Sequence, residues 1–139
     1  CKLACVMFGL DGLKKINDKF GHLGGDFVLK MVAARFNQGL RATDYFCRYD
    51  QDQFVLLLPE TDLQGAEILA HRLSEKLVDQ KVEFDGHHIG VTASFGVADL
   101  DMDQGEEDQL IGYAESAMLQ AKEIGPGETV VIGCNFQPI

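Results

Sequence analysis

The 139-residue sequence has no tryptophan, only three prolines and no long apolar run, and each shortage removes a class of protein. With 46% hydrophobic residues and few prolines, the chain is neither collagen-like nor disordered. Apolar runs such as Phe54–Leu58 and Thr129–Ile132 are far shorter than the ~20 residues that span a bilayer. A chain of this length corresponds to about one domain. We therefore expect residues 1–139 to form a single globular domain without membrane insertion.

Positive charge is also scarce. Twelve lysines and arginines stand against 22 aspartates and glutamates, which gives a formal net charge of −10. Such a chain repels a polyanion unless its few cations gather in one place. Neither nucleic acid nor an acidic membrane surface is expected as a partner.

Cysteine is present without a pattern that would give it a role. Cys1, Cys5, Cys47 and Cys134 form no C-x-x-C pair and no framework of a small secreted domain. Free thiols in a reducing cytoplasm are the expected state. The chain also opens at Cys1 directly in a strand-like run, so we expect a domain cut from a longer protein.

Hydrophobic periodicity predicts alternating strands and helices. Strands are expected at Lys2–Phe8, Tyr45–Tyr49, Gln53–Pro59, Val82–Phe84, Ile89–Ala98 and Thr129–Ile132. Helices are expected at Leu13–Lys19, from Gly24-Gly25 to near Arg41, at Leu63–Asp79 and at Gln109–Glu123. Helices that alternate with hairpins predict the α+β class, with a mixed β-sheet covered by helices.

Two details of this pattern bear on function. Tyr45–Tyr49 and Gln53–Pro59 are predicted to form a hairpin, although Asp50-Gln51 lacks the glycine that tight turns favour. In the helix Leu63–Asp79, Arg72 lies off the apolar stripe. We therefore expect the Arg72 side chain to face outward or toward a neighbouring element.

From Leu10 to Asp26 the chain reads L-D-G-L-K-K-I-N-D-K-F-G-H-L-G-G-D, which resembles the opening signature of GGDEF domains, the diguanylate cyclases of bacterial signalling. The resemblance continues without a gap through Arg41–Asp44, Cys47–Tyr49, Phe54–Pro59, Thr92–Val97 and Ala114–Lys122. It implies a fold similar to the palm of nucleotidyl cyclases. It also implies a reaction in which two Mg²⁺ ions help to join two GTP molecules into cyclic di-GMP.

The positions that carry this chemistry in the family are altered here. The family's first metal ligand, an aspartate, is replaced by Gly9, and the G-G-[DE]-E-F tip reads Asp50-Gln51-Asp52-Gln53-Phe54. Side chains replace the paired glycines, and the neutral Gln53 amide is a poor Mg²⁺ ligand that accepts no proton. We therefore expect no catalytic residue, no Mg²⁺ site and no cofactor.

The phosphate-binding end of the family site is only partly kept. In the family pattern K-x-x-G-R-N, Lys122 survives, whereas Pro126 and Gly127 replace the arginine and the asparagine. This loss of a phosphate cation supports the same expectation, namely no diguanylate cyclase activity.

Other residues of the family's GTP site are retained. Asn17 and Asp26 match its guanine-reading pair, and Lys14 matches a phosphate-side lysine. With Asp52 and Lys122 they would form a vestigial GTP site. The alternative is that Asn17 and its neighbours build a turn and a helix start that this fold needs whatever is bound.

Arg41-Ala42-Thr43-Asp44 matches the R-x-x-D motif at which product cyclic di-GMP inhibits many active family members. Its spacing to the hairpin tip is kept, and Arg72 takes the place of a further arginine of that site. An arginine bonds to guanine O6 and N7 or to a phosphate, and a carboxylate accepts from guanine N1–H and N2–H₂. The alternative is an exposed Arg41–Asp44 ion pair without a ligand, which would stabilise the fold only slightly.

We interpret the sequence as a catalytically inactive GGDEF domain that binds cyclic di-GMP through Arg41, Asp44 and Arg72 within a larger signalling or biofilm-regulating protein. A stacked ligand dimer would allow a second copy of the domain or an adjacent domain to join the complex. Two alternatives stay open. The first is a GTP-binding module that regulates an attached phosphodiesterase, and the second is an interaction or dimerisation scaffold that binds no nucleotide.

Overall fold

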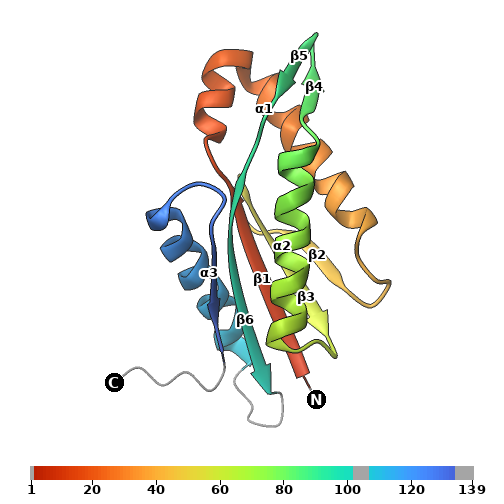
Figure 1. Cartoon of the computed structure of the whole chain (residues 1–139), viewed down its shortest axis with the longest axis vertical. Helices are drawn as coiled ribbons and strands as arrows, with labels where there is room; N and C mark the ends of the chain where they lie inside the picture. Colours follow the sequence, from red (N-terminus) through yellow and green to blue (C-terminus); the bar gives the residue numbers. More distant parts are fainter. Residues whose placement is uncertain (1, 102–106, 134–139) are drawn as a thin grey trace.

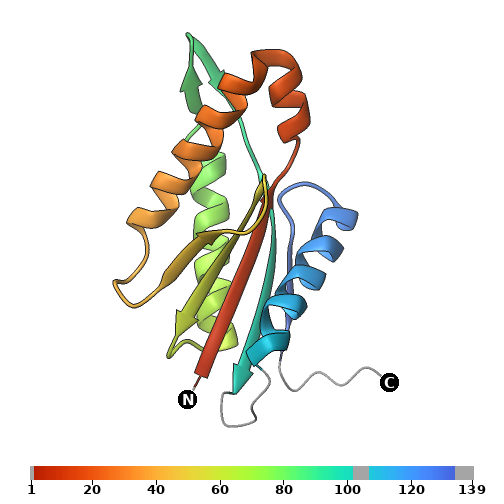
Figure 2. The same cartoon turned by 180° about the vertical axis from the view of Figure 1, so that it is seen from behind.

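A computed structural model describes residues 2–101 and 107–133 as a sheet with helices on both faces (Figure 1). Helices α1 (Leu13–Gln38) and α2 (Leu63–Asp79) share one hydrophobic core with one face of the sheet. Helix α3 (Glu107–Ile124) packs on the opposite face, as the view from behind shows (Figure 2). The molecule therefore has three layers.

The sheet has the strand order β2-β3-β1-β6-β7. The strands are β1 (Lys2–Leu10), β2 (Tyr45–Arg48), β3 (Gln53–Pro59), β6 (Ala93–Asp101) and β7 (Thr129–Ile132). All neighbours are antiparallel except β6 and β7, which are parallel. The predicted mixed sheet and the α+β class are confirmed.

Strand β1 is the centre of the core because both of its faces are covered. Its side chains alternate between the α1/α2 side and the α3 side, as the period of a strand requires. On the first side, the Phe8 ring lies 4.9 Å from Phe36, 5.1 Å from Phe54 and 5.3 Å from Phe95, measured between centroids. Aromatic packing thus joins β1, β3, β6 and α1, and it fixes the end of β1 beside the β2–β3 hairpin.

The two described cysteines are free thiols. Cys5 on β1 is fully buried, and this burial raises the pKa of its thiol from 9.0 to about 12. Cys47 on β2 is exposed. Cys1 and Cys134 lie outside the described residues.

Helix α1 contains both predicted helices, Leu13–Lys19 and the one that starts at Gly24-Gly25, in one element with a break. The break lies between them, at Gly21, where φ is 78° and ψ is 170°. Gly25 instead permits close packing, because a Cβ atom there would come within 1.7 Å of Asn17 Oδ1. The helix ends at Gln38, before a Gly39 cap, rather than near Arg41. Arg41 therefore lies in the connection to β2.

The predicted strand Ile89–Ala98 is also wrong, because it divides between two sheets. Strand β5 (His87–Ile89) pairs with β4 (Val82–Phe84) in a separate two-stranded sheet that projects beyond the main one (Figure 1). The chain then enters β6 at Ala93, where β1 becomes its partner. The apolar run Ile89–Ala98 thus pairs first with β4 and then with β1. Its periodicity alone does not reveal this change of partner.

The remaining elements agree with the predictions closely. The β2–β3 hairpin and β4 form as predicted, helix α2 has the predicted bounds, and β7 covers the predicted residues. Strand β1 continues through Gly9 to Leu10, and α3 begins at Glu107 rather than Gln109. Within the described part of the chain, no helix is long and apolar enough to cross a membrane.

Candidate functional site

The end of β1 and the start of β3 meet at the two positions where the family pattern carries acids. Gly9 pairs with Gln53 in the β1–β3 register. A Cβ atom on Gly9 would lie 3.5 Å from Gln53 Cγ and 3.0 Å from Lys122 Cε. Gly9 and Gln53 are therefore cross-strand neighbours, and neither supplies a carboxylate.

Asp52 is the one acid kept at the tip where the family has a ligand. Its residue is partly buried, and its backbone oxygen accepts a hydrogen bond from Leu10 N at 3.1 Å. Among residues 2–101 and 107–133, no group of three or more histidine, cysteine, aspartate or glutamate side chains is arranged to hold a metal ion.

The Asp11 carboxylate follows β1 and makes polar contacts at the start of β6, before β7 and on α3, all at the same end of the sheet. Its carboxylate accepts hydrogen bonds from Thr92 Oγ1 at 2.8 Å, Ser94 Oγ at 2.7 Å and Gly127 N at 2.9 Å. Lys122 Nζ lies 3.6 Å from Asp11 Oδ1, and the Asp11 side chain is only 14% exposed. Lys122, predicted to face a phosphate, is therefore paired with an internal carboxylate.

Arg48 supports the hairpin tip, which has no glycine. Its Nε donates to the carbonyl oxygens of Asp50 at 3.2 Å and Gln51 at 3.1 Å, and its Nη2 also donates to the Gln51 oxygen. The Asp50 carboxylate in turn accepts from Gln51 N at 2.8 Å. Side-chain contacts thus hold this turn in place.

A cavity of about 520 Å³ lies between α1 and the β2–β3 hairpin. Asp26, Lys30 and Arg48 contribute charged groups to its wall, and the apolar part is lined by Leu29, Ala33, Ala34, Phe46 and Phe54. Asp26 is the one predicted GTP-site residue among its lining residues. The cavity combines an apolar surface with a few charged groups, as small-molecule sites do.

The structure does not gather the rest of the predicted GTP site around that cavity. Lys14 is exposed on the first turns of α1. The Asn17 side chain lies against Gly25, next to Asp26 in the chain. Asp52 lies at the hairpin tip, and Lys122 is turned toward Asp11.

A second cleft, of about 240 Å³, brings together Arg41, Asp44 and Arg72. Arg41 and Asp44 come from the connection between α1 and β2, whereas Arg72 comes from α2. The remaining lining residues include Thr61 and Gly65, at the start of α2. Arg72 is exposed, as its place on the helix predicts.

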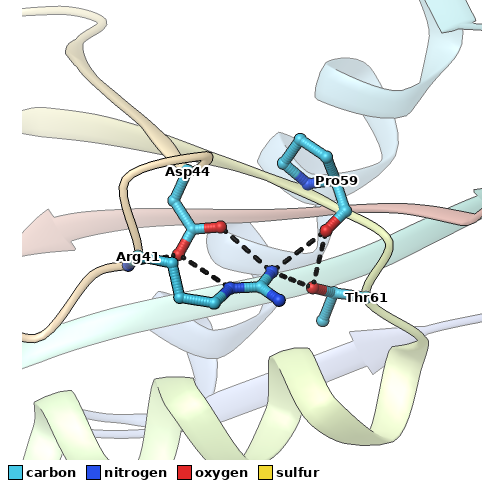
Figure 3. A network of polar contacts seen from close by, with 4 residues as sticks. All are labelled: Arg41, Asp44, Pro59 and Thr61. Atoms are coloured by element: carbon cyan, nitrogen blue, oxygen red, sulfur yellow. Dashed lines mark hydrogen bonds and ion pairs between the residues drawn. The ribbon is translucent and has the colours of Figure 1, made fainter.

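Arg41 is held at this cleft by a network of polar contacts (Figure 3). Its Nη2 lies 3.1 Å from Asp44 Oδ1, 3.0 Å from the Pro59 oxygen and 2.6 Å from Thr61 Oγ1. Asp44 Oδ2 accepts from Arg41 N at 2.9 Å and from Arg41 Nε at 3.5 Å. The pair therefore also stabilises the turn that leads into β2.

The two partners differ in exposure, and this decides what they offer a ligand. The Asp44 side chain is 4% exposed, whereas that of Arg41 is 55% exposed. Within the described residues, Arg41 Nη1 donates no hydrogen bond, so its two N–H groups are available. Beside Arg72, the cleft presents two guanidinium groups that suit an anion or the acceptor edge of a base.

Sequence reasoning did not identify Asp11 or Thr61 as members of these networks. Asp11 reaches Thr92 and Ser94 only because β1 and β6 pair. A local sequence feature beside Thr61 marks the start of α2. The next residue, Asp62, caps this helix, since its side chain accepts a hydrogen bond from Gly65 N at 2.8 Å.

Comparison with known proteins gives consistent matches. Residues 1–128 match the family model described as "Diguanylate cyclase, GGDEF domain". Diguanylate cyclase DgcP of Pseudomonas aeruginosa is 33% identical over 88% of this chain and 18% of its own length. Cyclic di-GMP phosphodiesterase NbdA of the same organism is 36% identical over 88% of this chain and 16% of its own length. The chain thus spans less than a fifth of either relative.

The fold is shared with solved structures as well. The crystal structure of the GGDEF domain of YfiN, also called TpbB, from Pseudomonas aeruginosa superposes with a TM-score of 0.88. The two chains are 27% identical, and the match covers 96% of this chain and 84% of that one.

Proposed function

The chain belongs to the GGDEF domain family of diguanylate cyclases, and on that premise we propose that it is a cyclic di-GMP receptor without cyclase activity. The observation that carries the proposal is the cleft in which Arg41, Asp44 and Arg72 meet. These residues come from two distant parts of the chain, so their proximity does not follow from the motif alone. The ligand is bound at this cleft and is not converted.

The chemistry of the cleft fits a guanine-containing diester. Cyclic di-GMP offers phosphate oxygens and the O6 and N7 acceptors of guanine, and arginine pairs with either group through two N–H donors. The planar guanidinium of Arg41 also provides a face on which a base can stack. Two cations in one place compensate locally for the formal charge of −10.

The proposed lack of cyclase activity follows from the shortage of metal-binding groups where the end of β1 meets the start of β3. Two Mg²⁺ ions need several carboxylate oxygens with free lone pairs. Gly9 and Gln53 supply none, and Asp11 already accepts three hydrogen bonds and faces Lys122. These residues do not fit the metal pair, so we derive no metal site and no reaction step here.

The size of the cleft bears on the partners. About 240 Å³ is less than the ~300–1,000 Å³ of sites that enclose a drug-sized ligand. A cyclic dinucleotide would therefore enter with one part and leave the other part accessible. A second copy of the domain or an adjacent domain of a longer chain would cover the accessible part. We place this signalling complex in the cytoplasm, where cyclic di-GMP acts.

The cavity of about 520 Å³ beside Asp26 favours a second candidate, a GTP-binding module that regulates an attached phosphodiesterase. Its volume suits a nucleotide, and Lys30 and Arg48 supply positive charge. Against it stand the exposed Lys14 and the pairing of Lys122 with Asp11. A domain that binds neither nucleotide would be an interaction scaffold.

Calorimetric titration with cyclic di-GMP and with GTP separates these functions. We expect cyclic di-GMP to bind the wild-type domain and Arg41→Ala to weaken binding at least 30-fold, because charge-assisted hydrogen bonds are lost. Arg48→Ala is the matched control, since it removes an arginine from the other cavity and should change the affinity less than twofold. Binding of GTP that Arg48→Ala abolishes would support the GTP module. If neither nucleotide gives a binding signal, the function that remains is the interaction scaffold.

A further inference from the structure

Thr61 is the side chain that links Arg41 to the loop before α2. Its Oγ1 lies 2.6 Å from Arg41 Nη2 and donates a hydrogen bond to the Pro59 oxygen at 3.1 Å (Figure 3). The hydroxyl therefore uses its single proton on Pro59 and offers its lone pairs to the guanidinium. Thr61 is thus an acceptor placed on the side of Arg41 opposite Asp44.

Thr61 is itself held in place, which gives the acceptor a defined position. The residue is partly buried, and its Cγ2 lies 3.2 Å from the point where a Cβ atom of Gly65 would stand. The hydroxyl bond to the Pro59 oxygen fixes the opposite side of the side chain. A β-branched side chain has few rotamers, and the hydrogen bond to Pro59 together with the partial burial restricts Thr61 further.

The donors of the Arg41 guanidinium can be assigned from these contacts. A guanidinium has five N–H donors in a fixed plane. The Nε donor and the two Nη2 donors face Asp44, Pro59 and Thr61. Among the described residues no acceptor contacts the two Nη1 donors, and the direction of these donors is set by how the guanidinium plane is held. Asp44 contacts the Nε and Nη2 side of the plane, and Thr61 Oγ1, which makes the shortest Nη2 contact, holds Nη2 from the other side together with the Pro59 oxygen.

We propose that Thr61 is a positioning residue for ligand binding, which holds the Arg41 guanidinium so that its Nη1 edge faces the cleft. This inference rests on the proposed function, since it concerns the affinity for cyclic di-GMP. Thr61 acts through Arg41 and need not touch the ligand. A preorganised arginine loses less conformational entropy when the ligand binds, which raises the affinity.

The test is a calorimetric titration of cyclic di-GMP into the wild-type domain and three variants. Thr61→Val keeps the shape of the side chain and removes the hydroxyl, and we expect the affinity to fall about 5- to 20-fold. Thr61→Ser keeps the hydroxyl and should bind within about twofold of wild type. Thr43→Val is the matched control, because Thr43 is exposed in the Arg41–Asp44 turn and its hydroxyl is not among the described partners of Arg41. Circular dichroism verifies that each variant is folded, and Thr61→Ala replaces Thr61→Val if the latter is not.

Each outcome decides the inference. A loss in Thr61→Val that Thr61→Ser restores and Thr43→Val does not reproduce supports it. Wild-type affinity in Thr61→Val overturns it, as does an equal loss in Thr61→Ser or in Thr43→Val. If the wild-type domain itself does not bind cyclic di-GMP, the proposed function fails and the inference fails with it. If the wild type binds while Thr61→Val is unchanged, only the inference fails.

Discussion

Two turns of this domain are each held by an arginine, and the groups that surround the two guanidinium groups differ. At the hairpin tip, Arg48 donates to the carbonyl oxygens of Asp50 and Gln51. At the other turn, Arg41 donates to the Pro59 oxygen but also pairs with Asp44, and Arg72 lines the same cleft. Neither Nη1 group donates a hydrogen bond among the described residues, but of the two arginines Arg41 is the one paired with a carboxylate and accompanied by a second guanidinium.

The comparison shows how unequal the demands of the two activities are. Metal-assisted transfer needs several carboxylates and a close backbone approach at once, so the loss of any one weakens the whole site. Binding needs only a few groups at one cleft. At the end of β1, Asp11 and Lys122 now neutralise each other and connect the sheet to α3. The Asp11 side chain is thus occupied by polar contacts within the fold, whereas the Arg41 side chain is 55% exposed, and this difference is why we propose binding at the Arg41 cleft.

The largest expected effect concerns GTP turnover. With Mg²⁺ and GTP, we expect cyclic di-GMP formation at least ~10³-fold below that of an active GGDEF domain assayed alongside, because Gly9 and Gln53 supply no carboxylate beside Asp52. Chromatography of the reaction mixture measures the product. Formation of cyclic di-GMP above that of a boiled control would contradict the proposed lack of cyclase activity.

The next effect concerns stability at the end of β1. Asp11→Ala removes the acceptor of three hydrogen bonds and leaves the fully buried Ser94 hydroxyl without it. We expect the free energy of unfolding in urea to fall by about 2–3 kcal/mol. Asp18→Ala, an exposed aspartate on α1, should change it by less than ~0.5 kcal/mol. If both variants change the free energy of unfolding by a similarly small amount, the hydrogen bonds of Asp11 do not stabilise the end of β1.

Arg72 sharpens the description of the other turn. Arg72→Ala should weaken cyclic di-GMP binding about 10-fold, less than Arg41→Ala, because Arg72 is an exposed second cation whereas Arg41 is held in place. Raising the salt concentration should reduce this difference, since part of it is electrostatic. An affinity unchanged by Arg72→Ala would confine recognition to the Arg41–Asp44 turn.

The smallest effect concerns Lys122. Its Nζ lies 3.6 Å from Asp11 Oδ1, and its side chain is 29% exposed, so solvent weakens the pair. Lys122→Ala should lower the free energy of unfolding by less than ~1 kcal/mol and leave cyclic di-GMP binding unchanged. A large loss of nucleotide affinity in this variant would instead indicate that Lys122 contacts a phosphate of the bound nucleotide at the end of β1.

Local features of the sequence predicted most of this fold. The apolar stripe of α2 gave its bounds and the exposure of Arg72, and the two apolar runs around Asp50 gave the β2–β3 hairpin. The family motif also identified Arg41, Asp44 and Arg72 as one site, and the three line one cleft. Each of these features depends on short-range periodicity or on a motif.

The errors and omissions depend on long-range contacts. Nothing local indicates that the run after His87 changes partner between β5 and β6, or that Gly25 permits close packing against Asn17. Asp11 and Thr61 matter because of strand pairing and a loop that returns to Arg41. Such contacts join residues that periodicity treats as independent.

Amide hydrogen exchange with and without cyclic di-GMP tests the contrast between the two turns most directly. Exchange slows where a ligand restricts local opening, and peptides resolve the two turns separately. We predict protection in the segments Arg41–Asp44 and Thr61–Arg72, with unchanged exchange at the hairpin tip from Tyr49 to Gln53. Protection at the hairpin tip and along the α1 cavity, or protection nowhere, would contradict the assignment of binding to the Arg41 cleft.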